Sequence, residues 1–345
     1  MRYLITGGLG FVGSNLASRL LEEGKEVCIL DNMHRTGSAN NLRWLTERWK
    51  EMTFHHVDVR NSSEVDRVIA AWKPDRLFHL AAQVAMTTSI ENPQLDFNTN
   101  ALGTLNILES MRHNAPGCHI IYASTNKVYG DLKGLRTEES ETRYVLPEKP
   151  QGLDVDVPLD FQSPYGCSKG AADQYVLDYH RVYGLNTTVF RHSTIYGDRQ
   201  FATYDQGWMG WFCQKALEQK SGDCESFTIS GDGKQVRDVL YVEDCVRCYL
   251  LASESPERTV GKAYNIGGGP ENSLSILELF DLLQTRLDVK LIYEKKPWRL
   301  SDQRIFISRI ARAKEDFGWE PTMEASRGVD RMLQWIQNMP ERDKR

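Results

Sequence analysis

The stretch Gly7-Gly8-Leu9-Gly10-Phe11-Val12-Gly13 follows a short apolar run, residues 3–6, and opens a helical pattern that continues to about residue 23. Glycines at this spacing let the chain turn tightly and let backbone N–H groups approach a pyrophosphate, whose charge the helix N-terminus also favours. The strand-turn-helix context therefore predicts a dinucleotide-binding turn at the start of a parallel sheet. The residues expected to contact the dinucleotide here are Gly7, Gly10, Phe11, Val12 and Gly13.

An acidic residue follows the second apolar run, residues 27–30. Asp31 lies eighteen positions after Gly13. A carboxylate there accepts hydrogen bonds from a ribose diol and repels a 2′-phosphate, so the sequence favours NAD over NADP. Arg35 lies close enough to weaken this preference, and Asp31 could also be an ordinary turn residue at a strand end.

Short apolar or β-branched runs alternate with helical patterns through the first half of the chain. This rhythm predicts a parallel sheet covered by helices on both faces, with right-handed crossovers. The expected strands are residues 3–6, 27–30, 53–57, 76–80 and 120–123, and later 188–191. The two longest helical patterns of this half are residues 95–112 and 165–183.

The second half has shorter elements and no internal repeat. We expect an α/β fold, a Rossmann-type doubly wound parallel sheet with a smaller C-terminal α/β substrate lobe over the carboxyl ends of the strands. The dinucleotide-binding domain is expected at residues 1–190, with about 232–255 returning to it, and residues 191–345 mainly form the substrate lobe. Residues 130–161, rich in acidic residues and proline, are interpreted as a long surface excursion.

Small and polar residues recur where the expected strands end. Asp58 could meet an adenine edge, and Leu80, Ala81 and Ala82 offer small side chains where a dinucleotide would cross the sheet. Their ordered recurrence extends the expected cofactor site beyond the glycine turn. The further expected cofactor contacts are Asn32, Arg35, Asp58, Val59, Leu80, Ala81, Ala82, Gln83, Asn100, Ser124, Tyr165, Lys169 and His192.

A tyrosine and a lysine lie four residues apart in one helical pattern. Tyr165 and Lys169 therefore share a helix face, and Ser163 and Pro164 can begin that helix. The pKa of a phenol, ~10 in reference compounds, must fall by about three units for the group to act as a base at neutral pH. This shift corresponds to about 4 kcal/mol of stabilisation of the phenolate. Lys169 and a positive nicotinamide could supply this together. A hydroxyl of Ser124 or Thr125, at the end of the fifth strand, could hydrogen-bond the reacting oxygen.

The composition excludes several other classes of protein. The 345 residues carry a net charge of −5 with scattered basic residues, which argues against a nucleic-acid partner. No apolar run is long enough for a membrane span, no signal peptide is recognised, and seven dispersed cysteines fit a reducing compartment, so a cytoplasmic protein is expected. Cys245 and Cys248 lack a second pair, and no metal site is predicted.

Several motifs together resemble those of the extended short-chain dehydrogenase/reductase family. They are T-G-G-x-G-F-V-G at residues 6–13, S-T-x-x-V-Y-G at 124–130, Y-x-x-x-K at 165–169, and Arg237-Asp238-Val239 leading to Asp244. The resemblance covers nearly the whole chain. It implies that Thr125, Tyr165 and Lys169 are the catalytic set and that the second lobe binds a nucleotide-diphosphate sugar. It also makes Arg237 and Arg304 candidates for the nucleotide and its phosphates.

The residues after Thr125 separate the reactions of this family. Its dehydratases carry Asp-Glu where this chain has Asn126 and Lys127, because elimination of water needs an additional acid and base. Decarboxylating members keep a glutamate at the position of Lys127. Neither carboxylate is present, which leaves epimerisation through a transient ketone. Lys127 could contact the sugar or a phosphate, or donate a proton, and the sequence does not decide among these.

A closer resemblance is to the members that epimerise a CDP-linked hexose at C2. It rests on four long runs, residues 83–90, 124–131, 163–174 and 199–208. It implies a tightly bound NAD that is regenerated in each turnover. The alternatives are a UDP-sugar 4-epimerase and a non-catalytic NAD-sensing regulator. The expected substrate contacts are Thr87, Asn126, Lys127, Gln200, Tyr204, Trp208, Arg237 and Arg304. Relatives commonly associate through helices matching 95–112 and 165–183, so a dimer or tetramer is expected.

Overall fold

A computed structural model of the chain describes residues 1–299 and 302–343. Its centre is a seven-stranded sheet in the order β12-β8-β5-β4-β1-β2-β3, with every neighbouring pair parallel. The order reverses beside β1, as in a doubly wound sheet, and the predicted fold class is confirmed. The strands are β1 (Arg2–Thr6), β2 (Glu26–Asp31), β3 (Thr53–His56), β4 (Arg76–His79), β5 (His119–Thr125), β8 (Asn186–His192) and β12 (Lys262–Ile266).

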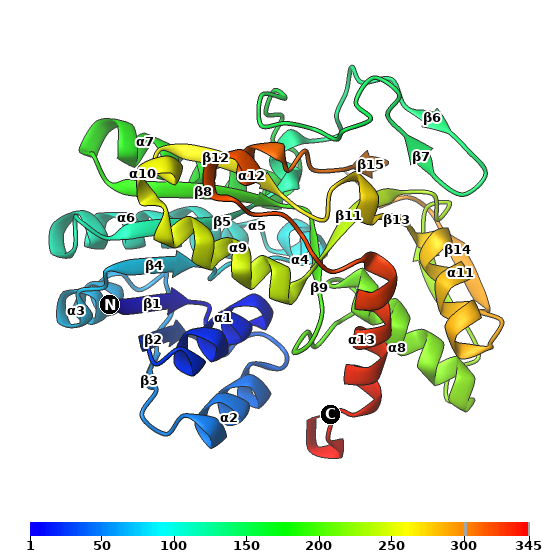
Figure 1. The fold of residues 1–345 in the computed structure, drawn as a ribbon, viewed down its shortest axis with the longest axis horizontal. Coiled ribbons are helices and arrows are strands. Elements are labelled where there is room, and N and C mark those ends of the chain that lie inside the picture. Colours follow the sequence, from blue (N-terminus) through cyan, green and yellow to red (C-terminus); the bar gives the residue numbers. More distant parts are fainter. Residues whose placement is uncertain (300–301, 344–345) are drawn as a thin grey trace.

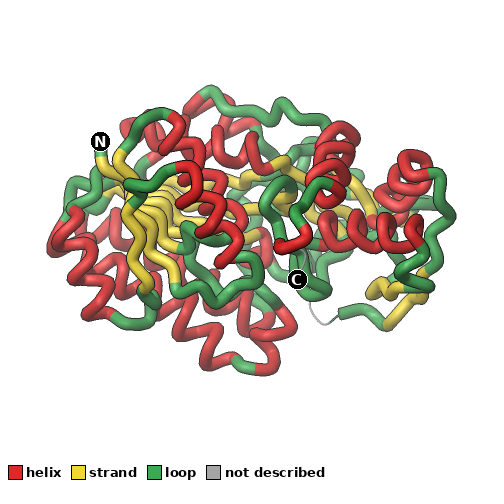
Figure 2. Tube along the Cα trace, turned by 90° about the horizontal axis from the view of Figure 1, so that it is seen from below, coloured by secondary structure: helices red, strands yellow, loops and turns green. Residues whose placement is uncertain are grey.

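Helices cover both faces of this sheet (Figures 1 and 2). Successive strand residues point to opposite faces, so β1 sends Leu4 into one apolar core and Ile5 into the other. The first core is shared with α3 (Ser62–Trp72), α6 (Gly103–Asn114) and α7 (Ser163–Tyr183). The second core is shared with α1 (Phe11–Glu22) and α9 (Val242–Glu254), while α2 (Ser38–Arg48) packs beside α1.

The helix predicted at residues 95–112 is interrupted. It consists of α5 (Pro93–Phe97), a π-helical turn η1 (Asn98–Leu102) and α6. The buried Asn100 lies in the π turn, where its side chain accepts from the Gln83 N–H at 2.8 Å and donates to the Ser168 hydroxyl at 3.0 Å. Such bulges recur at functional sites. This one ties the loop after β4 to the helix that carries Tyr165.

The interpretation of residues 130–161 as a surface excursion is wrong in part. The segment holds the short hairpin β6 (Glu138–Glu139) and β7 (Tyr144–Val145), and it buries Leu132, Tyr144 and Leu153 against Phe306. These apolar residues are irregularly spaced among prolines and acidic residues, so no period of 2 or 3.6 revealed them.

The C-terminal half builds two small sheets beside the large one (Figure 1). One pairs β11 (Val236–Tyr241) with β9 (Thr194–Tyr196), β13 (Ser273–Ser275) and β15 (Ile305–Phe306), and the other pairs β10 (Phe227–Ser230) with β14 (Tyr293–Lys296). The remaining elements are α4 (Met86–Glu91), η2 (Asn126–Tyr129), α8 (Trp208–Ser221), α10 (Pro256–Thr259), η3 (Pro270–Asn272), α11 (Ile276–Leu287), α12 (Ala311–Phe317), α13 (Ala325–Gln337) and η4 (Glu341–Asp343). Because α9 packs on α1 and β12 joins the large sheet, the chain returns to the first lobe. The boundary at residue 190 stays a prediction.

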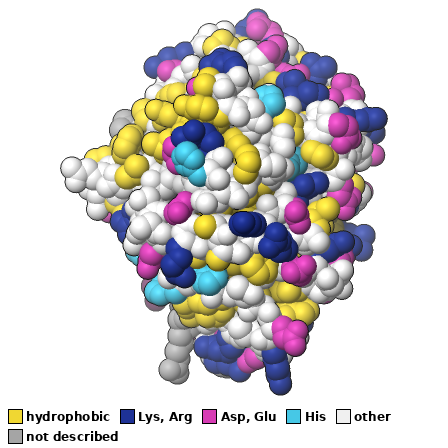
Figure 3. All heavy atoms as spheres, turned by 90° about the vertical axis from the view of Figure 1, so that its left-hand side faces the viewer, with side chains coloured by type: hydrophobic (Ala, Val, Ile, Leu, Met, Phe, Trp, Pro, Cys, Tyr) yellow, Lys and Arg dark blue, Asp and Glu magenta, His cyan; other side chains and the backbone are white. Residues whose placement is uncertain are grey.

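The surface at the amino ends of the large sheet mixes acidic and basic side chains (Figure 3). Among the described residues, no helix has the length and apolar character that crossing a membrane requires.

Candidate active site

A cavity of ≈ 470 Å³ opens at the carboxyl ends of the large sheet, where the C-terminal lobe meets it. Doubly wound sheets bind their ligands at this place. Twenty of the residues that the sequence singled out line it: Gly7, Gly10, Phe11, Val12, Gly13, Asp31, Asn32, Arg35, Val59, Leu80, Ala81, Ala82, Gln83, Ser124, Thr125, Tyr165, Lys169, His192, Gln200 and Trp208.

The glycine turn has no room for side chains. A Cβ on Gly7, whose φ is +69°, would lie 2.7 Å from Ala81 N, and one on Gly13 would lie 2.3 Å from Gly7 O. Asp31 accepts hydrogen bonds from Leu9 N at 3.0 Å and Met33 N at 2.7 Å, while burial raises the pKa of its carboxyl. The bare backbone at the cavity edge and the carboxylate at the end of β2 fit a dinucleotide.

A segment of the second lobe closes over this end of the cavity. Arg35 hydrogen-bonds the Gln206 side chain, and burial lowers the pKa of its guanidinium. Gly37 is packed so tightly under the Phe201 ring that a Cβ would lie 2.1 Å from a ring carbon. Residues 199–206 thus contact the cofactor side of the cavity as well as the substrate lobe.

Lys169 is buried beneath the cavity, one helical turn after Tyr165. Its Nζ donates to Ala123 O at 2.5 Å and lies 4.2 Å from the centre of the Tyr122 ring. Burial lowers the pKa of Lys169 to about 7, although Asp173 and Asp96 raise it. Tyr165 lies in the first turn of the same helix, where the Ser163 hydroxyl accepts the Gly166 N–H at 3.2 Å.

Tyr165 reaches the cavity beside Thr125. Burial raises the pKa of the Tyr165 phenol to about 12, hydrogen bonding with Thr125 lowers it, and Asp96 raises it. The sequence predicts a base that titrates much lower, so additional positive charge near the phenol is needed for that chemistry.

His192 lies at the floor of the cavity on β8. Its Nε2 is 2.8 Å from the Tyr249 hydroxyl, and its buried Nδ1 has no hydrogen-bond partner among residues 1–299 and 302–343. Burial, followed by the charge of Lys169, lowers the pKa of His192 to about 3, so the ring is neutral. The free Nδ1 is a polar atom that fits a ligand amide or hydroxyl.

Two of the expected cofactor residues do not line the cavity. Asn100 instead holds the Gln83 backbone, as described above. Asp58 binds Arg60 and Asn32. Burial raises the pKa of Asp58, but the hydrogen bonds from Arg60 and Asn32 outweigh it and lower the pKa to about 2. Direct contact of Asn100 and Asp58 with the cofactor remains a prediction.

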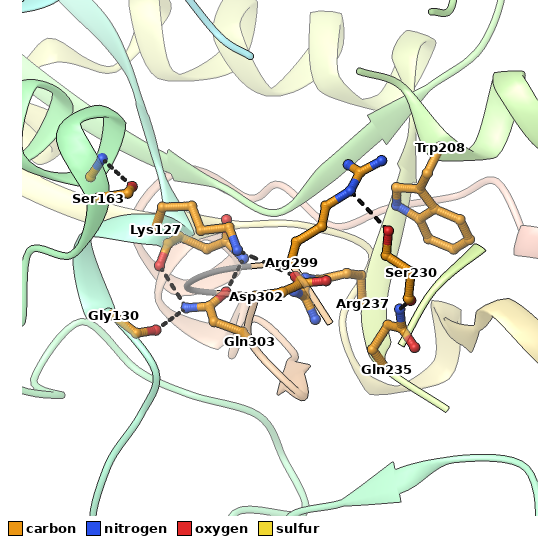
Figure 4. Close-up of polar contacts among 12 residues, drawn as sticks. Lys127, Gly130, Ser163, Trp208, Ser230, Gln235, Arg237, Arg299, Asp302 and Gln303 are labelled. Carbon is orange, nitrogen blue, oxygen red and sulfur yellow. Dashed lines mark hydrogen bonds and ion pairs between the residues drawn. The ribbon is translucent and has the colours of Figure 1, made fainter. Parts of the chain in front are cut away.

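The expected substrate residues separate into groups. Lys127 and Arg237 both pair with Asp302, at 3.5 Å and 3.0 Å (Figure 4). Burial lowers the pKa of Lys127 to about 8 and also lowers that of Arg237. Arg304, in contrast, is exposed with its guanidinium 5.3 Å from the centre of the Tyr144 ring.

Three other expected substrate residues lie outside the cavity lining. Thr87 is one residue before the lining Thr88, Tyr204 is 43% exposed, and Asn126 is buried behind Thr125. Tyr204 contacts a residue that sequence reasoning missed. The Arg299 guanidinium lies 5.0 Å from the Tyr204 ring centre and donates to the Ser230 hydroxyl at 3.2 Å (Figure 4).

The comparisons with known proteins agree with this site. The chain matches the family model described as GDP-mannose 4,6 dehydratase over residues 4–332. It therefore belongs to this family of extended short-chain dehydrogenases/reductases, which confirms the resemblance. Within the family it is 53% identical to the CDP-paratose 2-epimerase of Salmonella typhi, over 98% of this chain and 100% of that protein.

Solved structures show the same fold. The UDP-glucose 4-epimerase of Thermotoga maritima with UDP-glucose has a TM-score of 0.81 and 31% identity, covering 98% of this chain and 99% of that one. The UDP-glucuronic acid 4-epimerase of Bacillus cereus, in complex with UDP-glucuronic acid and NAD, has a TM-score of 0.83 and 25% identity, covering 99% and 100%.

Proposed function

We propose that this chain is an NAD-dependent epimerase that inverts C2 of a CDP-linked hexose, of the CDP-paratose to CDP-tyvelose type. One observation carries the proposal: Thr125, Tyr165 and Lys169 line the same cavity as the bare glycine turn. The 53% identical relative supports the nucleotide and the carbon. NAD, when bound, supplies the acceptor and donor of a hydride, held by the glycine turn, Asp31 and Lys169.

In the proposed reaction, Tyr165 takes the proton of the C2 hydroxyl while C2 loses its hydride. Thr125 hydrogen-bonds the C2 oxygen, and the Lys169 ammonium favours the phenolate form of Tyr165. The 2-keto sugar turns in the cavity, C2 regains hydride on its other face, and Tyr165 returns the proton. Since the hydride is not exchanged with water, product formed in D2O should carry no deuterium at C2.

Product identification tests the proposal. The purified protein is incubated with CDP-paratose, CDP-tyvelose and a panel of UDP-hexoses, and the products are identified by NMR. We expect inversion at C2 of the CDP-hexoses. Inversion at C4 of a UDP-hexose alone would favour the second candidate, a UDP-sugar 4-epimerase, which the 31% identical UDP-glucose 4-epimerase supports. No epimer from any member of the panel would refute both.

Lys127 and Arg237 are proposed to bind the substrate diphosphate. Both cations pair with the half-buried carboxylate of Asp302, and burial lowers the pKa of each, so the two partly desolvated charges favour an anionic ligand group. We expect Lys127→Met to raise KM for the CDP-hexose about tenfold or more, since a hydrogen-bonded charge contact is worth about 1.5–3 kcal/mol. Steady-state kinetics measure this. Arg304→Met is the matched control, and an equal rise in its KM would place the diphosphate elsewhere.

We further propose that a second copy of the chain covers the outer face of α5, η1 and α7. Large apolar side chains are exposed there: Phe97 is 56% exposed, Tyr175 50% and Val182 58%. Large apolar side chains exposed on helices that contact one another favour association. Tyr175→Glu with Val182→Glu should give monomers by light scattering after size exclusion. Ile292→Glu, at a position 60% exposed on the other lobe, should leave the assembly unchanged. A wild-type protein that is already monomeric would contradict the proposal.

A further inference from the structure

The Thr125 hydroxyl makes two hydrogen bonds to the turn that follows it, one as donor and one as acceptor. A threonine hydroxyl has one proton to donate and two lone pairs. Thr125 Oγ1 donates to Asn126 Oδ1 at 3.3 Å and accepts from Lys127 N at 3.2 Å. Its remaining lone pair is left for the Tyr165 phenol, which lines the same cavity and whose pKa Thr125 lowers. The direction of the Thr125 proton therefore depends on which atom Asn126 presents to it.

Two main-chain carbonyls fix which atom that is. Gln303 is 1% exposed, and its Nε2 donates to Asn126 O at 3.2 Å and Gly130 O at 2.6 Å (Figure 4). Carbonyl oxygens only accept, so the Gln303 amide nitrogen must face them and its Oε1 must face the Asn126 side chain. Oε1 in turn requires a donor, and Asn126 Nδ2 supplies it at 3.0 Å.

The orientation of one amide thus sets that of the other. With Nδ2 committed to Gln303, Asn126 can present only its Oδ1 to Thr125, and an oxygen there accepts the Thr125 proton. When Asn126 holds the Thr125 proton, Thr125 Oγ1 presents a lone pair to Tyr165. That lone pair can accept a hydrogen bond from the phenol O–H, so this arrangement favours the protonated phenol. When the phenol ionises, Thr125 can stabilise the phenolate only by turning its proton away from Asn126.

We propose that Asn126 and Gln303 form a positioning pair that aims the Thr125 proton away from Tyr165 and so keeps this phenol protonated at higher pH than Thr125 alone would. The inference rests on the proposed function for its use in turnover. In turnover Tyr165 must serve first as a base and then as an acid. By favouring the protonated phenol, the pair assists the second step, in which Tyr165 returns a proton to the C2 oxygen. Asn126 then acts through Thr125 and not by touching the sugar.

The other ionisable groups around Tyr165 do not belong to this pair. Asp96 acts on the phenol from α5, Tyr122 approaches from β5, and Lys169 lies on the same helix. Lys127 and Asp302, the chain neighbours of Asn126 and Gln303, pair with each other at 3.5 Å (Figure 4). Asn126→Leu and Gln303→Met leave all of these charges in place, so a change in Tyr165 ionisation in these two variants can be attributed to Thr125.

The test uses two substitutions of similar size with opposite expected effects. Asn126→Leu removes the acceptor, so the Thr125 proton can turn to the phenolate and the acidic limb of kcat/KM should move to lower pH by about one unit. Asn126→Asp adds a carboxylate near the phenol, which disfavours phenolate, and should move that limb to higher pH by about one unit. Gln303→Met frees Asn126 to turn its Nδ2 towards Thr125, so it should shift the limb downward, as Asn126→Leu does.

A second measurement does not depend on the substrate. In protein labelled with ¹³Cζ-tyrosine, the Tyr165 resonance is identified by its loss in Tyr165→Phe, and its titration should move in the same directions. Failure of the C2-epimerase proposal would leave these shifts intact. In a Thr125→Val background the Asn126→Leu shift should vanish. Asn265→Leu removes an equally buried amide, bonded to Tyr129 and Leu153, and should lower thermal stability without moving the Tyr165 titration. Shifts of the same sign for Asn126→Leu and Asn126→Asp, or a shift that persists in Thr125→Val, would overturn the inference.

Discussion

Tyr165→Phe is expected to lower kcat by about 10²–10⁴-fold while the protein keeps its NAD, because a positioned acid-base group contributes a factor of that size. The substitution removes only the phenolic oxygen and leaves the ring that packs at the cavity edge. Thr125 and Lys169 would remain in the cavity, but Lys169 lies one helical turn after residue 165 and its Nζ donates to Ala123 O, so it is not positioned to replace the phenol. Turnover is measured with CDP-paratose, and NAD is measured after denaturing the protein.

The same helix offers a matched control. Tyr175 is 50% exposed on α7 and lies outside the cavity lining, so Tyr175→Phe should keep wild-type turnover. Wild-type kcat in Tyr165→Phe would refute the role of this phenol. Loss of turnover together with loss of NAD would instead attribute the effect to the cofactor site.

The glycine turn and the large sheet were predictable from the sequence because their signals are local. Gly7 to Gly13 lie within one turn, and every strand of the sheet except β12 is expected from a short apolar or β-branched run in its own residues. Parallel strands also end at the same edge, so strand-end residues such as Asp31, Thr125 and His192 converge without any knowledge of distance. The structure brings these three to one cavity.

The second half of the site was less predictable because it depends on contacts between distant segments. Gln303 and Asn126 are 177 positions apart, and neither has a local pattern that marks the other as its partner. Arg299 follows a short strand in a basic, proline-containing stretch, where the sequence alone does not distinguish it from Arg304. Only the fold shows that the Arg299 guanidinium hydrogen-bonds Ser230, whereas the Arg304 guanidinium lies over the Tyr144 ring.

Breaking the buried ion pair beneath the active site is expected to have the largest effect on stability. Arg191 donates to both Asp173 oxygens at 2.9 Å, and the side chains are 4% and 0% exposed. The Ser124 hydroxyl donates to the same carboxylate at 2.7 Å, so α7 is held to the ends of β5 and β8. Arg191→Met should cost about 3–5 kcal/mol in the free energy of unfolding, because it leaves the Asp173 carboxylate buried without its cation. Urea denaturation measures this.

The double variant Arg191→Met with Asp173→Leu distinguishes the pair from its packing. Replacing both charges by apolar side chains of similar size removes the uncompensated charge, so most of the lost stability should return. Turnover should not return with it, because Ser124 and the Tyr129 hydroxyl would lose the partners that fix β5 and the turn after it against α7. Full recovery of both stability and kcat would mean that packing alone positions Tyr165 and Lys169. Recovery of stability without kcat would assign to the ion pair the placement of the catalytic helix.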